Sequence, residues 1–429
     1  MSQGYRPTPH PTRRTGQILL VLWVILTLSQ LAFVLGYGHN QPWADEWEFV
    51  PTLTGHEPVG PFFLHPHNEH RLPLPRSIYI ALWELTHDFR AGMVLQVGLL
   101  STMAYRGMCL AEWRRGRPHW ADAFFPLTLL HVGHCENLLM GYQLCFVLAS
   151  ALAFGVLELA VRKTPENGPR TAGLAALASL ALALSGGFGI ILAVPILVWV
   201  GWLILSNRKR YLASGISLVT VVYIGYYFAT YERPPDHPPF AWKNWAASVQ
   251  VAGQFLAISF GIGVGAVWFI VLPLVLMASG ISCRSRGIFA VASGAILLAL
   301  AIGASRGGFN SRIEMGLWPR YSVLAWLLIA ATFFASLNSG DARSRWIPIG
   351  MVSLAILAYL PNTLYGLSYG IRHHNWMNAI EKQLRAGESA DDIVHHSLEG
   401  TGQEERARVG IPMLYAAKIG PFAEWKGAP

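Results

Sequence analysis

The chain has 429 residues, of which 53% are hydrophobic and only 13% are charged. Soluble globular domains carry roughly 25% charged residues, so the composition excludes an ordinary soluble protein and indicates a membrane protein. The formal net charge of +8 does not indicate a nucleic-acid partner, because Lys and Arg in membrane proteins mark cytoplasmic loops and anionic headgroups. The four cysteines show no CxxC or Cys/His spacing, so neither a zinc-finger module nor a disulfide framework is indicated.

Apolar stretches predict an all-α polytopic membrane protein, because a helix needs about 20 apolar residues to cross the hydrocarbon core. The first stretch follows Arg13 and Arg14 and, at about 22 residues, is longer than the apolar core of a signal peptide. The stretches 121–135 and 171–185 are short, which favours tilted or re-entrant helices. We predict about eleven spans, at residues 16–37, 91–110, 121–135, 143–161, 171–185, 187–206, 211–229, 255–280, 288–304, 321–337 and 346–366.

Short basic loops predict the orientation of these spans. Loops such as "RRGR" (114–117) and the N-terminal segment 1–15 carry Arg or Lys and almost no acids, so the positive-inside rule makes them cytoplasmic. The transmembrane part then covers 16–366, with a helical first outer loop at 38–90 and a small helical outer tail at 367–429. We therefore predict a multi-pass protein of the inner (cytoplasmic) membrane whose functional site faces the periplasmic, extracytoplasmic side.

The first outer loop begins with the acidic stretch "PWADEWEF". Asp45 and Glu46 lie between two tryptophans, whose low local dielectric is expected to raise the pKa of a carboxyl group. A carboxylate of this kind suits a base that deprotonates a hydroxyl group. We interpret Glu48 in the same stretch as an ordinary solvated loop charge.

The loop continues with "FLHPHNEHRLPLPR", which concentrates polar side chains in a few residues. They form either a polar loop that hydrogen-bonds its own backbone, a metal site, or a cluster that meets Asp45 and binds a sugar or phosphate. No HExxH-type zinc signature is present, so a divalent metal cation stays an open alternative. The candidate binding residues here are His67, Asn68, Glu69, His70 and Arg71.

Glu136 and Asn137 occur in "HVGHCENLLMGYQ", at the turn between two predicted spans. Ionisable groups at membrane depth cost roughly 2.5–3.5 kcal/mol each, so they usually line a cavity or a turn. The pattern fits both a substrate-binding pair and an ordinary polar hairpin tip.

A second cluster of cations lies in "SRGGFNSRIEMGLWPRYS", before the predicted span 321–337. Arginine matches phosphate oxygens with two parallel hydrogen bonds, whereas a single Arg can also extend toward lipid headgroups. Three arginines opposite an acidic loop favour an anion site, with Arg320 and its neighbour Tyr321 as first candidates and Arg306 as second.

With these motifs in place, the chain resembles the GT-C class of integral-membrane glycosyltransferases. The resemblance rests on the many spans, on the acidic pair of "ADEWEF" just after the first span, and on "HNEHR", "ENLLMGYQ" and "RGGFNSRIEMGLWPRY". It implies a transferase that moves a sugar from a polyprenyl-phosphate carrier to an envelope glycan, lipid or protein acceptor. The tail is shorter than many acceptor-binding domains of that class.

The resemblance also implies roles for single residues. Asp45 takes the place of the base toward the acceptor hydroxyl, and Glu46 supports it or helps to hold a divalent cation. Arg320, with Arg306 as second choice, faces the carrier phosphate. The alternatives are a transporter or flippase of lipid-linked sugars and a structural subunit; no internal repeat of the transporter kind is evident.

Overall fold

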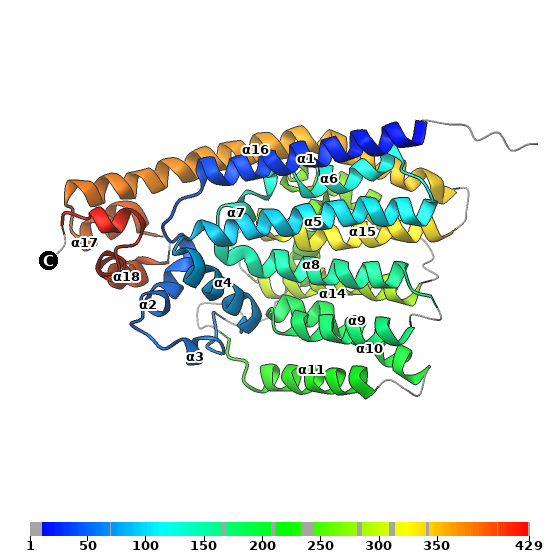
Figure 1. The fold of residues 1–429 in the computed structure, drawn as a ribbon, viewed down its shortest axis with the longest axis horizontal. Helices are drawn as coiled ribbons and strands as arrows, with labels where there is room; N and C mark the ends of the chain where they lie inside the picture. The colour runs from blue at the N-terminus through cyan, green and yellow to red at the C-terminus, as the bar shows by residue number, and fades with distance from the viewer. Residues whose placement is uncertain are drawn as a thin grey trace, which may run out of the picture.

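The computed structural model describes residues 11–68, 70–164, 168–206, 211–233, 244–280, 285–308, 314–339, 343–400 and 402–427. The protein is all-α and 83% helical, and no strand occurs in these ranges. Figure 1 shows most helices running side by side along the long axis of the molecule. The prediction of an all-α membrane protein is therefore confirmed.

Eight helices of the described ranges are long and apolar enough to cross a membrane. Each corresponds to one predicted stretch, which confirms a multi-pass membrane protein. They are α1 (Pro11–Tyr37), α5 (Arg90–Arg115), α8 (Leu144–Val161, its span beginning at Gly141), α10 (Gly187–Leu205), α11 (Tyr211–Ala229), α14 (Arg286–Arg306), α15 (Ser322–Ser339, its span beginning at Pro319) and α16 (Trp346–Ala386).

The other three predicted stretches form shorter helices, so the expected count of about eleven spans is corrected to eight in the described ranges. Residues 171–185 fall on α9, which has 16 residues. Residues 121–135 and 255–280 are broken into several pieces. The first consists of η2 (Trp120–Ala123), α6 (Phe124–Leu129), η3 (Val132–His134) and the start of α7 (Cys135–Leu138); the second consists of the end of α12 (Trp245–Ala257), η6 (Ile258–Phe260), η7 (Ile262–Val264) and α13 (Trp268–Ser279), whereas α9 is a single helix (Gly168–Ala183).

A side chain of α16 stabilises one of these breaks. Gly261 has φ = 100°, a left-handed value that glycine adopts readily. The Asn362 amide accepts a hydrogen bond from the Gly263 N–H (2.5 Å) and donates one to the Phe260 carbonyl (2.8 Å). Because non-helical backbone at membrane depth must find partners within the protein, Asn362 permits a break that hydropathy does not reveal.

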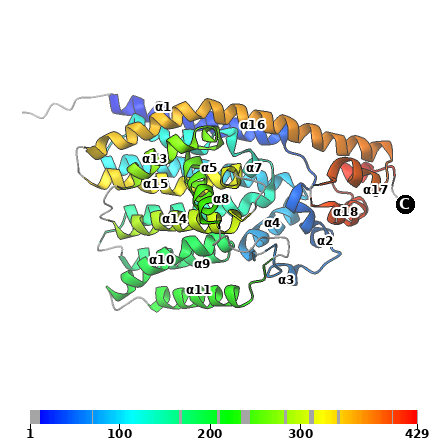
Figure 2. The same ribbon diagram turned by 180° about the vertical axis from the view of Figure 1, so that it is seen from behind.

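The 38–90 segment and the tail lie together at one end of the helix bundle, opposite the start of α1 (Figures 1 and 2). The segment is helical, as predicted, and α16 continues past its apolar part and ends at Gly387 (φ = 85°). The elements here are η1 (Ala44–Phe49), α2 (Val50–Leu53), α3 (Val59–Phe62), α4 (Pro73–Thr86), α17 (Ala390–Ile393), the π-helical turn η11 (Val394–Leu398), α18 (Glu404–Ala416) and η12 (Gly420–Glu424). The remaining short turns are η4 (Gly141–Gln143), η8 (Met315–Leu317), η9 (Pro319–Tyr321) and η10 (Arg343–Arg345).

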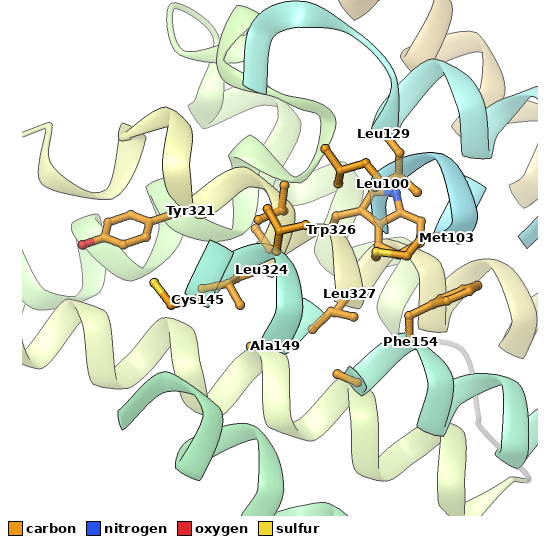
Figure 3. Packing of buried hydrophobic residues seen from close by; sticks show 14 of the residues in the cluster. Leu100, Met103, Leu129, Cys145, Ala149, Phe154, Tyr321, Leu324, Trp326 and Leu327 are labelled. Atoms are coloured by element: carbon orange, nitrogen blue, oxygen red, sulfur yellow. The ribbon is translucent and has the colours of Figure 1, made fainter. Parts of the chain in front are cut away.

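Helix α15 occupies the middle of the bundle, where it packs against α5, α8 and α14. Its Trp326 is fully buried, donates a hydrogen bond from Nε1 to Thr128 Oγ1 (2.9 Å) and lies beside Leu100 and Met103 in Figure 3. Tyr321, at the other end of that view, lies directly before this helix, as the last residue of η9. The residues at the start of α15 are thus held by the best-packed helix of the protein.

Gly107→Ala is expected to destabilise the protein by about 1–3 kcal/mol through overpacking, because a Cβ there would lie 2.4–2.8 Å from three ring atoms of Phe125. Gly98, on the same helix, has nothing within 4 Å of an added Cβ. Gly98→Ala is the matched control and is expected to be neutral or slightly stabilising through helix propensity. Thermal unfolding in detergent compares the two variants, and equal midpoints would contradict the packing of α5 on α6.

Candidate functional site

A cavity of about 420 Å³ opens at the end of the bundle that carries the 38–90 segment. Segments far apart in the sequence contribute to it: η1, the turn at 67–70, η4, and the ends of α10, α11, α14 and α15. Seven predicted site residues line it together, namely Asp45, His67, Asn68, His70, Arg306, Arg320 and Tyr321.

The opposite side of the cavity is apolar. Phe188 and Ile191 of α10, Leu298 and Ile302 of α14, and Phe228 of α11 line it. The cavity therefore has a charged half next to η1 and a hydrocarbon-like half between membrane-spanning helices, which fits a ligand with a polar head and an apolar chain.

Asp45 projects from η1 with 23% of its side chain exposed, and its Oδ2 lies 3.7 Å from His67 Nε2. Ala44 before it has a left-handed backbone (φ = 48°), which is unfavourable for a residue with a Cβ. Burial raises the pKa of Asp45, but His67, Arg320 and Arg406 outweigh burial and bring the pKa below its ordinary value. The expected upward shift is therefore wrong for Asp45, because nearby cations stabilise the carboxylate.

Glu46 points away from the cavity and is fully buried. Its carboxylate accepts hydrogen bonds from Tyr79 Oη (2.8 Å), the Trp43 N–H (3.0 Å) and the Tyr142 N–H (3.3 Å). Burial raises the pKa of Glu46 to about 7, although these hydrogen bonds oppose the shift. Glu46 thus carries the upward shift expected for the pair, and it connects η1 to α4 and η4 rather than facing the cavity.

Glu48 is not a solvated loop charge, which corrects the interpretation from the sequence. Its side chain is 11% exposed; one oxygen lies 2.5 Å from Arg76 Nη2, and the other forms a short hydrogen bond with His67 Nδ1 and lies 3.7 Å from Arg406 Nη1. Burial raises the pKa of Glu48, but these three cations outweigh burial and bring the pKa below its ordinary value. Arg76 itself is fully buried.

Glu136 and Asn137 hold Arg320 instead of lining the cavity. Glu136 Oε2 lies 3.3 Å from Arg320 Nε, and Asn137 Nδ2 donates a hydrogen bond to the Arg320 carbonyl (3.3 Å). The Arg320 guanidinium also stacks on Trp318, with Cζ 4.0 Å from the ring centroid. The Tyr321 ring stacks on the same indole, with 6.3 Å between the ring centroids. The indole is thus held by Tyr321, and it orients the Arg320 guanidinium at the cavity wall.

The turn at 67–71 connects η1 to the outermost helix, α11. His70 Nδ1 lies 3.0 Å from Tyr227 Oη, and Arg71 Nη1 donates to the Thr230 carbonyl (3.0 Å). Figures 1 and 2 show α11 at the edge of the molecule, so these bonds close one side of the cavity. His70 contributes to the lining, Arg71 does not, and Glu69 lies outside the described residues.

Sequence reasoning missed Tyr142 and Gln143, which line the cavity from η4. Tyr142 Oη and Gln143 Oε1 are buried and have no hydrogen-bond partner within the described ranges. Buried polar atoms are normally paired, so these two atoms are suited to binding a polar ligand. They follow directly after "ENLLMG", in which the sequence analysis selected Glu136 and Asn137 but not these two residues.

Within the described ranges, no group of three or more His, Cys, Asp or Glu side chains is arranged to hold a metal ion. His67 instead hydrogen-bonds Glu48, and Glu46 is surrounded by protein donors. The divalent cation stays an untested prediction.

No protein-family model, no curated protein and no solved structure matches the chain. Any function must therefore be argued from the geometry of the cavity and the chemistry of its side chains.

Arg76→Leu is expected to destabilise the protein by about 3–5 kcal/mol, the usual cost of removing one partner from a buried ion pair. The control is Arg90→Leu. Arg90 forms an ion pair with Asp88 at 2.6 Å, but the Arg90 side chain is 39% exposed. Loss of this exposed pair is expected to lower the free energy of unfolding by less than about 1 kcal/mol. Denaturation in detergent measures both variants. Equal losses would show that Glu48 does not depend on Arg76.

Proposed function

We propose that the protein is a membrane glycosyltransferase of the GT-C kind, acting at the periplasmic, extracytoplasmic face of the inner membrane. It moves a sugar from a polyprenyl-phosphate carrier to an envelope glycan, lipid or protein acceptor. The sequence resemblance in "ADEWEF" and "RGGFNSRIEMGLWPRY" suggests this class, and the cavity supports it independently.

The observation that carries the proposal is the joint lining of one cavity by Asp45, Arg306 and Arg320. A sugar on a lipid phosphate needs a base for the acceptor, a cation for the phosphate and an apolar path for the chain. The cavity supplies all three, with its apolar half between α10, α11 and α14. The charged groups lie at the ends of the helices, whereas transporters of this size place binding groups near the midplane.

The proposed reaction breaks the bond between the anomeric carbon and the phosphate oxygen. The bonding electron pair leaves with the polyprenyl phosphate, whose negative charge Arg320 and Arg306 stabilise. The acceptor oxygen bonds to the anomeric carbon, where positive charge develops in the transition state, and its proton passes to Asp45. Products are the glycosylated acceptor and the polyprenyl phosphate.

The protonation state of Asp45 suits this role. The cations that lower its pKa keep the carboxylate ionised at neutral pH and thus free to accept a proton, although the lowered pKa makes it a weaker base than the raised pKa expected from the sequence. A single attacking step without an enzyme nucleophile inverts the anomeric configuration. Glu46, which faces the protein interior, contributes by holding the backbone of η1 and Tyr142.

Asp45→Asn is expected to lower sugar transfer by at least about 100-fold, the lower range for loss of a general base, and to leave the folded protein intact. The assay uses purified protein in nanodiscs, a panel of polyprenyl-phosphate-linked monosaccharides and an envelope extract, with mass spectrometry of the products. The control is Asp391→Asn, since Asp391 is an exposed tail residue. Full turnover by Asp45→Asn would remove Asp45 from the base role.

Arg320→Ala is expected to raise KM for the lipid-linked donor about tenfold or more, since a charge-assisted hydrogen bond contributes about 1.5–3 kcal/mol. The KM for the acceptor is expected to change little. Arg385→Ala, on the exposed end of α16, is the matched control. An unchanged donor KM together with unchanged turnover would show that Arg320 does not bind the phosphate.

A further assay of the purified protein in liposomes distinguishes a transferase from a transporter. Liposomes that contain the protein and a lipid-linked sugar are assayed both for a new glycosidic bond and for movement of the sugar across the bilayer. Movement without any new bond, across the whole donor and acceptor panel, would overturn the proposal in favour of a flippase.

A further inference from the structure

A chain of alternating charges leads from the protein interior to the cavity. It runs from Arg76 on α4 to Glu48 on η1, then to His67, and ends at Asp45. Arg76 is fully buried and His67 is 4% exposed. Of these four residues, the transfer reaction proposed above uses only Asp45. The function of Arg76, Glu48 and His67 is left to be explained.

Hydrogen bonds hold Arg76 from two sides and so define where Glu48 must lie. Its Nη1 donates to the carbonyls of Phe62 (2.6 Å) and His65 (2.5 Å), while its Nη2 donates to Glu48 Oε1 (2.5 Å). The guanidinium also lies over the Phe62 ring, with Cζ 4.2 Å from the centroid. This arrangement anchors the Glu48 carboxylate to the backbone of the turn that leads to His67.

Glu48 in turn sets the orientation of the His67 ring. It binds Nδ1, and the backbone of His67 exchanges two hydrogen bonds with His70 at 2.7 and 2.8 Å. The imidazole packs against the Tyr142 ring at 4.8 Å. With Nδ1 occupied, only Nε2 is directed at Asp45 and the cavity.

We propose that His67, oriented by Glu48, is a positioning residue that holds the Asp45 carboxylate at the cavity wall and keeps it ionised. The inference rests on the proposed transferase function, which it deepens by assigning a role to a residue that does not itself react. Histidines between two carboxylates are commonly fixed in one orientation in this way.

The charged and titratable groups around His67 come from five elements. Asp45 and Glu48 raise the pKa of His67 to about 9 despite its burial, which by itself would lower it. His67 is therefore protonated at neutral pH. The other groups facing this cluster are Arg76 on α4, Tyr142 on η4, Arg320 on η9 and Arg406 on α18.

The sign of the pH dependence follows from these shifts. Because the pKa of His67 is raised in the folded state, its protonation contributes to folding stability, and this contribution is fully present below about pH 6.5. That contribution is lost as the pH rises through about 9. The lowered pKa of Asp45 acts in the opposite range, and its contribution is lost only under acid conditions.

The first test compares His67→Gln with His65→Gln, an exposed neighbour whose side chain lies outside the cluster. In His67→Gln, kcat is expected to fall about 100-fold, the cost of displacing a reacting group, at an unchanged donor KM. The acid limb of its kcat/KM profile is expected to move to higher pH than in wild type and in His65→Gln. An acid limb at the wild-type position would overturn the inference, since a purely structural role would lower the rate without moving the profile.

The second test does not depend on activity. Magnetic resonance of protein with isotope-labelled histidine, with the His67 signal assigned through His67→Gln, follows its protonation in nanodiscs. We expect a charged imidazole at pH 7 that loses its proton near pH 9, and earlier loss in Glu48→Gln. A neutral His67 at pH 7 would overturn the inference.

The two tests distinguish the possible failures. Loss of transfer in Asp45→Asn with a wild-type profile in His67→Gln would leave the transferase standing and refute the positioning role. Absence of transfer by the wild type with every donor would refute the transferase, and with it the role assigned to His67, even if the resonance data show the expected charge.

Discussion

The buried carboxylate of Glu48 connects the parts of the molecule that form the cavity. It belongs to η1, and its partners come from the turn at 67–70, from α4 and from the tail helix α18. Burying one charge is unfavourable unless other charges compensate it, so the surrounding elements must assemble together around this group. Asp45, three residues earlier in the same short helix, takes its place in the cavity as a consequence.

The second half of the cavity depends on a different constraint. Arg320 follows Pro319 at the start of the central helix α15, and Glu136 and Trp318 contact its guanidinium. The carboxylate side is thus held by a polar network and the guanidinium side by the packed bundle. The carboxylate and the guanidinium are therefore held by separate sets of contacts.

Apolar length alone predicted eight of the long helices, since a span of about 20 apolar residues has few other outcomes. Hydropathy did not reveal the break at Gly261, because the Asn362 amide that permits it is 99 residues away in the chain from Gly263. It also overestimated the helix at 121–135, where η2, α6 and η3 follow one another. Local patterns predict elements well, whereas breaks depend on partners that are distant in sequence.

The same limit applies to the acidic pair. The sequence placed Asp45 and Glu46 near one another and near the membrane edge, but the direction of each pKa shift depends on remote groups. Glu46 is buried among hydrogen-bond donors, whereas Asp45 faces cations. Glu48 appeared to be the least interesting of the three acids, because the residues that pair with it follow 19 and 28 positions later. Its importance is visible only when the chain is folded.

The tail packs directly against η1, the short helix that carries Asp45. Gly410 of α18 lets the chain approach the Trp47 ring, since an added Cβ there would lie 3.0 Å from a ring atom. Phe422 of η12 meets the same indole at 6.0 Å, edge to face, and Arg406 reaches Glu48. The tail therefore covers η1 and adds the Arg406 cation to the charges near Asp45.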